Sequence, residues 1–191
     1  MIADTVKIKR HDSVYYPRED SYMLASAVQR FAKGEMLDLG TGSGIQGIVA
    51  AKSGCRVTFA DIDPAAIAAA RRNAAANGVT GTFIVSDMFS NISNRFDVIS
   101  FNPPYLPSDS IKEPALDGGK DGRRFINKFL SGFREHLKPG GFALLVESSF
   151  NKWHLDLSKG AELVAKEHYF FEDLVVLRFR CAETFIEFRR P

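Results

Sequence analysis

The chain has 191 residues, 45% of them hydrophobic and 25% charged, which is the balance of an ordinary globular domain with a sizeable core. Its formal net charge of +2 argues against a strongly basic nucleic-acid binder, and its sequence suggests neither a membrane span nor a signal peptide. Two cysteines, Cys55 and Cys181, are too few for a disulfide framework or a zinc cluster, so we expect buried thiols, a cytoplasmic location and no metal site.

The first half of the chain alternates between short apolar runs and amphipathic stretches. Asp63 is expected to cap a helix that begins at Pro64, and Asn77-Gly78 is expected to end it. The predicted helices cover residues 22–31, 45–52 and 64–77, and the predicted strands cover 36–39, 56–60, 82–85 and 96–101.

The second half begins with a polar, glycine-rich segment at 107–122, longer than most loops and so expected to be functional or mobile. Helices are predicted at 126–137 and 155–166, and strands at 142–147, 174–179 and 184–188. This order predicts an α/β fold: a mostly parallel seven-stranded sheet with helices on both faces and a C-terminal antiparallel hairpin. We expect a single domain over residues 1–191, with a 1–34 N-terminal segment and first helix preceding a 35–191 core. Ligands of such sheets bind beyond the C-terminal ends of the strands.

A glycine-rich turn at residues 38–44 joins the first predicted strand to its helix. Glycines there let the backbone approach a ligand and leave the helix N-terminus facing an anionic group. The spacing also matches the dinucleotide fingerprint, so the glycines alone do not separate NAD from other nucleosides. Asp38 favours a different ligand, because its carboxylate would repel a pyrophosphate but bind the ammonium of an amino-acid moiety. A purely structural turn is the alternative.

Two further acids follow the next two strands. Asp61 ends the second strand, where a carboxylate accepts hydrogen bonds from both hydroxyls of a ribose. Asp87 follows the third strand, where it is expected to accept the exocyclic amine of adenine while Met88 or Phe89 packs on the ring. Taken alone, Asp87 is equally a surface turn residue. Acids at three strand ends together favour adenosine.

The most specific motif, Asn102-Pro103-Pro104-Tyr105, closes the fourth strand. Its prolines hold the backbone extended and leave carbonyl groups free to accept hydrogen bonds. We expect the Asn102 side-chain oxygen and the Pro103 carbonyl to bind both hydrogens of a planar NH2 group, with the Tyr105 ring offering a flat face. These four residues are the predicted catalytic residues, and an asparagine–proline turn without chemistry is the alternative.

Together these motifs resemble the class I S-adenosylmethionine-dependent methyltransferases, whose coproduct is S-adenosylhomocysteine. The tetrad narrows the resemblance to enzymes that methylate nitrogens conjugated to a π system, namely adenine or cytosine amines and the glutamine amide of translation release factors. Segments 15–21 and 116–122 are similar to the short eukaryotic and archaeal form of the HemK-type release-factor glutamine methyltransferases. The resemblance extends from about Val14 to the terminal hairpin.

The resemblance implies a Rossmann-like class I methyltransferase fold, S-adenosylmethionine as cofactor, a release factor as protein substrate and a small zinc-binding activator subunit docked along the sheet. Bacterial members carry an N-terminal helical domain, and the 1–34 segment is too short to match it. Recognition is therefore expected from the 107–122 loop, the N-terminal segment or the activator. The residues expected to bind the cofactor are Ser21, Asp38, Gly40, Thr41, Gly42, Gly44, Asp61, Ile62, Asp87, Met88 and Asn102.

Other functions stay open at this point. A methyltransferase acting on adenine or cytosine amines of DNA or RNA fits the same tetrad, although the weak net charge disfavours it. Some relatives of the short form methylate lysine. A subunit that keeps the fold without the chemistry is disfavoured by the intact tetrad and the three acids. A local basic patch is still conceivable from Arg71-Arg72, Lys120, Arg123-Arg124 and Arg189-Arg190.

Overall fold

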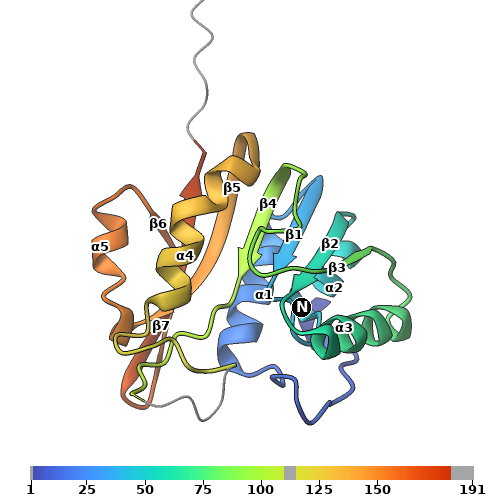
Figure 1. Cartoon of the computed structure of the whole chain (residues 1–191), viewed down its shortest axis with the longest axis horizontal. Coiled ribbons are helices and arrows are strands. Elements are labelled where there is room, and N and C mark those ends of the chain that lie inside the picture. The colour runs from blue at the N-terminus through green and yellow to red at the C-terminus, as the bar shows by residue number, and fades with distance from the viewer. Residues whose placement is uncertain (1, 110–114, 182–191) are drawn as a thin grey trace, which may run out of the picture.

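The computed structural model describes residues 2–109 and 115–181, which form a seven-stranded sheet with helices on both faces (Figure 1). The strand order is β3-β2-β1-β4-β5-β7-β6. Strands β1 to β5 run parallel, and β7 is antiparallel to both of its neighbours. The strands are β1 (Glu35–Leu39), β2 (Arg56–Asp61), β3 (Thr82–Val85), β4 (Phe96–Phe101), β5 (Leu137–Ser148), β6 (Glu162–Tyr169) and β7 (Glu172–Arg180). The predicted fold class is confirmed.

Alternation of side chains along the central strands divides the core into two layers. Met36 and Val98 pack in the layer that contains α1 (Glu19–Phe31), α2 (Ile45–Lys52) and α3 (Pro64–Ala76). Their neighbours Leu37 and Ile99 face the other layer, which contains α4 (Arg124–Gly132) and part of α5 (His154–Leu157). Three short 3-10 helices complete the described elements: η1 (Ile2–Thr5), η2 (Phe133–His136) and η3 (Ser149–Asn151).

The start of α3 shows how local sequence sets an element boundary. Asp63 lies in the extended region, and its Oδ1 accepts a hydrogen bond from the Ala65 amide at 2.8 Å. Pro64 occupies the first helical position, where its missing N–H costs nothing. Gly78 follows the helix with a φ of 68°, a left-handed conformation that ends the helix. The predicted cap and stop are both confirmed.

The C-terminal region corrects the prediction in two places. The helix expected at 155–166 is wrong, because α5 ends at Leu157 and Gly160 turns the chain with a φ of 92°. Glu162–Tyr169 then forms β6, whose backbone groups pair with β7, so tertiary pairing overrides local helix propensity. The antiparallel hairpin therefore consists of β6 and β7. The strand expected at 184–188 lies outside the described residues.

Two smaller boundaries also differ from the prediction. The helix expected to reach residue 137 ends at Gly132 and continues as η2, and β5 begins at Leu137, five residues before Phe142.

Within residues 2–109 and 115–181, no helix is long and apolar enough to cross a membrane.

The strand order places the candidate site. Strands β2 and β3 lie on one side of β1, whereas β4 lies on its other side. The strand order therefore reverses between β1 and β4. Ligands of open α/β sheets bind outside the C-terminal ends of the strands at such a reversal. The glycine-rich turn after β1 and the tetrad after β4 both meet there.

Candidate active site

The glycine-rich turn is tied to the end of β2. Gly42 adopts a φ of 51°, and its amide donates a hydrogen bond to Asp61 Oδ2 at 2.9 Å. A Cβ at this position would meet no atom nearer than 4.0 Å, so the turn presents open space here. Gly44 begins α2 with a φ of 87°, and a Cβ there would lie 3.1 Å from Ala70 of α3. Glycine is thus required for close packing at Gly44 and for a left-handed bend beside open space at Gly42.

Asp38 stabilises this turn by accepting three hydrogen bonds. Its Oδ2 accepts hydrogen bonds from Thr41 Oγ1 at 2.6 Å and from the Gly47 amide at 2.9 Å, while Ser100 Oγ donates to Oδ1 at 3.3 Å. The side chain is 1% exposed, and burial raises its pKa to about 7 although three donors oppose the rise. The structure therefore gives Asp38 a structural task that its position in the sequence does not reveal. Its contact with a ligand ammonium stays a prediction.

Asp61 lies between the turn and the start of α3. Besides Gly42, the Asp63 amide donates to its Oδ1 at 3.0 Å. Burial raises the pKa of Asp61, and the backbone donors partly offset that effect. The next residue, Ile62, is 64% exposed and forms an apolar surface beside the carboxylate. Binding of a ribose by Asp61 stays a prediction.

Asp87 has a partner that the sequence did not suggest. Lys128 Nζ of α4 lies 2.8 and 2.9 Å from the two carboxylate oxygens of Asp87, in an exposed ion pair. The next residue, Met88, adopts a φ of 51°, which is unusual for a non-glycine residue and tends to occur at ligand-binding sites. Binding of adenine by Asp87 and Met88 stays a prediction, and Lys128 joins the residues at that position.

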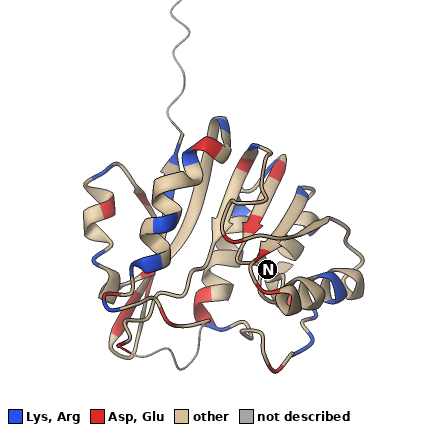
Figure 2. Ribbon diagram, viewed as in Figure 1, with Lys and Arg blue, Asp and Glu red and all other residues tan. Residues whose placement is uncertain are grey.

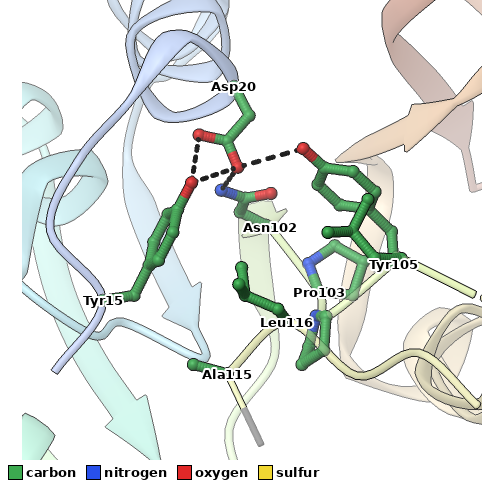
Figure 3. A pocket seen from close by; sticks show the side chains of 9 residues that line it. Tyr15, Asp20, Asn102, Pro103, Tyr105, Ala115 and Leu116 are labelled. Atoms are coloured by element: carbon green, nitrogen blue, oxygen red, sulfur yellow. Dashed lines mark hydrogen bonds between the residues drawn. The ribbon is translucent and has the colours of Figure 1, made fainter. Parts of the chain in front are cut away.

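The tetrad contacts Asp20, a buried carboxylate that was not among the predicted site residues (Figure 3). Asn102 Nδ2 donates to Asp20 Oδ2 at 3.1 Å, and the buried Oδ1 of Asn102 has no hydrogen-bond partner among the described residues. The Tyr15 hydroxyl lies 3.1 Å from both oxygens of Asp20, and the Tyr105 hydroxyl lies 3.5 Å from Oδ2. Asp20 is 4% exposed, so the N-terminal segment, α1 and the tetrad join at one buried acid.

These residues line one small pocket. Figure 3 shows the Asn102 amide near the centre, with the Tyr15 and Tyr105 rings on either side. Burial beside Asp20 raises the pKa of both tyrosines, so both hydroxyls keep their protons and act as donors to that acid. The other lining residues come from the tetrad and the loop that follows it: Pro103, Pro104, Leu106, Ala115 and Leu116. The structure thus brings all four predicted catalytic residues together.

Ser21 adjoins this pocket through its contact with Asp20. Its Oγ donates to Asp20 Oδ1 at 3.1 Å, and its carbonyl accepts from Gln46 Nε2 of α2 at 3.0 Å. The residue is 3% exposed, so its side chain supports the acid and its backbone joins α1 to the helix of the glycine-rich turn. A direct contact of Ser21 with a cofactor stays a prediction.

Asn73 of α3 and Asn77, which directly follows that helix, fix the path of the N-terminal segment. Asn77 exchanges two hydrogen bonds with the backbone of Lys7, at 2.9 and 2.8 Å. Asn73 is fully buried, and it accepts from the Lys9 amide at 3.1 Å and donates to the Ser43 carbonyl at 2.9 Å. The segment that carries Tyr15 is therefore anchored to the same turn that forms the cofactor side of the site.

A buried polar network supports the tetrad from the other side. Asn151 Nδ2 donates to the Tyr105 carbonyl at 2.7 Å, and it also lies 3.3 Å from the Gly122 carbonyl. Arg123 follows Gly122 and pairs with Glu147 at 3.0 Å and Asp156 at 2.7 Å, both fully buried. Burial and then the neighbouring Asp156 carboxylate raise the pKa of Glu147, although Arg123 opposes the rise. The 116–122 segment is thus tied to the end of β5.

Comparison with known proteins places the chain in a family. A family model described as the methyltransferase small domain matches residues 18–170. The chain belongs to this methyltransferase family. The strand-end residues described above thus belong to the catalytic domain of a methyltransferase.

Curated relatives of this methyltransferase act on different substrates. A protein of Methanocaldococcus jannaschii assigned as an N5-glutamine methyltransferase is 36% identical over 185 residues, which cover 90% of this chain and 94% of that protein. The release factor glutamine methyltransferase of Geobacter sulfurreducens is 36% identical over 71% of this chain and 53% of its own length. Ribosomal RNA small subunit methyltransferase C of Serratia proteamaculans is 33% identical over 68% of this chain and 35% of its own length.

Solved structures confirm the fold of the methyltransferase. The Mtq2–Trm112 complex of E. cuniculi, described as responsible for the methylation of the termination factor eRF1, matches with a TM-score of 0.71 and 24% identity. The match covers 90% of this chain and 99% of that chain. The chain has the Rossmann-like fold of class I methyltransferases.

Proposed function

We propose that this methyltransferase uses S-adenosylmethionine to methylate the side-chain amide nitrogen of a glutamine in a translation release factor. The observation that carries the proposal is the Asn102 amide, whose NH2 group is held by Asp20 while its buried oxygen has no partner in the part of the chain that the structure describes. A buried acceptor without a donor is costly, and a substrate N–H would satisfy it. The names of the relatives that match most of this chain support glutamine as the source of that N–H.

The other half of the site suits the cofactor. The open surface at Gly42 leaves room for a ligand against the turn, and Asp61 stands beside it with a carboxylate suited to ribose hydroxyls. Asp87 and Met88 lie at the end of the next strand, where adenine is expected. Solved structures of the same fold hold this cofactor or its product, including an RNA methyltransferase with AdoMet and an N-methyltransferase with S-adenosylhomocysteine.

The protein contributes to the reaction by positioning the substrate nitrogen. The cofactor supplies a methyl group already activated on a sulfonium. An amide nitrogen is a weak nucleophile, so the protein must hold it in line, about 3–3.5 Å from the methyl carbon and shielded from water. Asn102 Oδ1 and the Pro103 carbonyl accept the two N–H groups and favour the positive charge that develops on nitrogen. No base is required before transfer, because the methylated nitrogen becomes acidic and loses its proton afterwards.

Charge favours a protein substrate over a nucleic acid. Figure 2 shows basic residues on α4 but acidic ones at the start of α1, so charges of both signs lie on the elements around the site. The formal net charge of the chain is only +2, whereas nucleic-acid binding depends on many cationic contacts to phosphates. The base-amine alternative therefore has less support.

We also infer a small partner subunit, because the similar Mtq2 structure was solved as a complex with Trm112. Zinc in that partner stays a prediction. Both cysteines are free thiols, which supports action in a reducing compartment such as the cytoplasm.

Methyl transfer from labelled S-adenosylmethionine tests the proposal. The purified chain, with and without a candidate partner, is incubated with the release factor of the same organism or with mixed DNA and RNA. We expect label on one glutamine of the release factor, located by tandem mass spectrometry, and far less label with Asn102→Ala. Label on nucleic acid alone would favour the base-amine alternative, and label on lysine would exclude glutamine as the preferred acceptor.

A further inference from the structure

Asp20 accepts hydrogen bonds from more residues than any other described carboxylate of the site. Asp20 accepts hydrogen bonds from Tyr15, from Asn102 and from both the amide and the hydroxyl of Ser21, the Ser21 amide being 2.6 Å from Oδ1. Tyr105 completes the group at 3.5 Å. The carboxylate is nearly enclosed, and its neighbours come from three separate segments of the chain. Such a group defines the orientation of whatever side chain it contacts.

We propose that Asp20 is a positioning residue that locks the Asn102 amide with its oxygen toward the pocket, so that the site selects a neutral side-chain amide over a carboxylate or an ammonium. The proposal rests on the proposed function for the identity of the substrate. The locked amide itself follows from contacts within this chain.

Hydrogen-bond chemistry fixes the orientation. A carboxylate only accepts hydrogen bonds, whereas an asparagine amide has an accepting end and a donating end. Turning the Asn102 amide by half a rotation would place its oxygen against Asp20 Oδ2 at about the present 3.1 Å, with two acceptors facing each other. The same turn would point NH2 into the pocket. Only the observed orientation satisfies Asp20, and it leaves the buried Oδ1 as the end of the amide that is still without a donor among the described residues.

The locked oxygen discriminates between side chains of nearly equal size. A primary amide brings the N–H that Oδ1 lacks. A carboxylate brings only acceptors, and it would stand near the negative charge of Asp20. An ammonium is attracted by the negative charge of Asp20, but it brings a third N–H for which the two acceptors of the clamp, Asn102 Oδ1 and the Pro103 carbonyl, leave no place. A buried donor without an acceptor is disfavoured, so glutamine is preferred over both glutamate and lysine.

The orientation can be measured directly by NMR. In the 15N-labelled protein, the Asn102 side-chain NH2 signals are identified by their loss in Asn102→Ala, and their exchange with solvent is compared between variants. We expect protected signals in the wild type and exchange at least tenfold faster in Asp20→Asn, where either end of the Asn102 amide finds a partner. Glu19→Gln, the same change at the exposed neighbouring position, is the matched control and should leave the exchange unchanged. Unprotected wild-type signals would overturn the proposal, whatever the variants do.

Selectivity is measured with the release factor and two variants in which Glu or Lys replaces its methylated glutamine. These variants compete against the unaltered release factor. We expect the wild-type enzyme to bind the Glu variant at least tenfold more weakly than the Gln protein, and Asp20→Asn to reduce this ratio below threefold. If Asp20 had a merely structural role, Asp20→Asn would weaken the binding of the Gln protein and of the Glu variant equally. An unchanged ratio in folded Asp20→Asn would therefore overturn the proposal.

The two proposals fail in different ways. An enzyme that methylates no release factor, yet protects the Asn102 NH2 group and loses this protection in Asp20→Asn, would refute the proposed substrate and support the locked amide. An enzyme that methylates the release factor with an unprotected Asn102 would support the substrate and refute the lock.

Discussion

The exchange Asn102→Asp tests the electrostatics of the site, because it adds a second acid beside Asp20. The new oxygen would take the place of Nδ2, 3.1 Å from Asp20 Oδ2, and would replace a hydrogen bond with two facing acceptors. Asp20 is only 4% exposed, so solvent screens this pair weakly. At an effective dielectric constant of about 20, two unit charges at that separation repel by about 5 kcal/mol.

A shared proton limits this cost. One bound proton turns the repulsion into a hydrogen bond, and holding it costs about 1.4 kcal/mol for each pH unit above the ordinary aspartate pKa of about 3.9. The expected loss in free energy of unfolding is therefore about 1.5 kcal/mol at about pH 5 and about 4 kcal/mol at about pH 7. The folded variant binds one more proton than the unfolded chain in this range. Its stability must consequently fall, relative to wild type, as the pH rises.

Urea unfolding of the wild type, Asn102→Asp and Asn102→Ala between about pH 5 and about pH 7 measures this effect. The gap between the wild type and the Asp variant should widen by about 1.4 kcal/mol per pH unit. Asn102→Ala adds no charge, so its offset from the wild type should not change with pH. A pH profile of Asn102→Asp that runs parallel to the wild type would refute the reasoning, since it would mean that Asp20 and residue 102 do not interact electrostatically.

Three further predictions concern the two halves of the site and its support. Asn102→Ala should lower single-turnover methyl transfer by about 10²–10³ with little change in cofactor affinity, and a near-wild-type rate would refute the clamp. Asp61→Ala should weaken cofactor binding in calorimetry by about 1.5–3 kcal/mol, and unchanged affinity in a folded variant would remove Asp61 from the site. Arg123→Met leaves Glu147 and Asp156 buried without a cation and should cost about 3–5 kcal/mol in thermal unfolding, and adding Glu147→Gln should recover part of that loss. No recovery would mean that buried charge is not the cause.

The parts of the molecule that follow from local chemistry were predictable from sequence. The cap at Asp63, the break at Gly78 and the short parallel strands each depend on a few adjacent residues. The tetrad was predictable for the same reason, since the prolines and the planar side chains at its ends restrict what the segment can do.

The rest depends on contacts that no local pattern encodes. Glu162–Tyr169 contains good helix formers, and it is a strand only because β7 offers a ladder of partners. Asp20 looks like an ordinary acid in the first turn of a helix, and its role depends on Asn102, which is 82 residues away. Segments 15–21 and 116–122 carried the signal for Asp20 and for the Arg123 network, but only the fold shows which side chains matter.

Both halves of the site are closed by contacts between residues that lie far apart in the chain. On the cofactor side, Ser100 donates to Asp38 from 62 residues away, and the Lys9 amide donates to Asn73 from 64 residues away. On the substrate side, Asn102 is 82 residues from Asp20, and Asn151 is 46 from Tyr105. Contacts that close long loops cost more chain entropy to form, so neither half is held by its own local sequence. Gentle warming should therefore abolish cofactor binding and methyl transfer together, rather than one before the other.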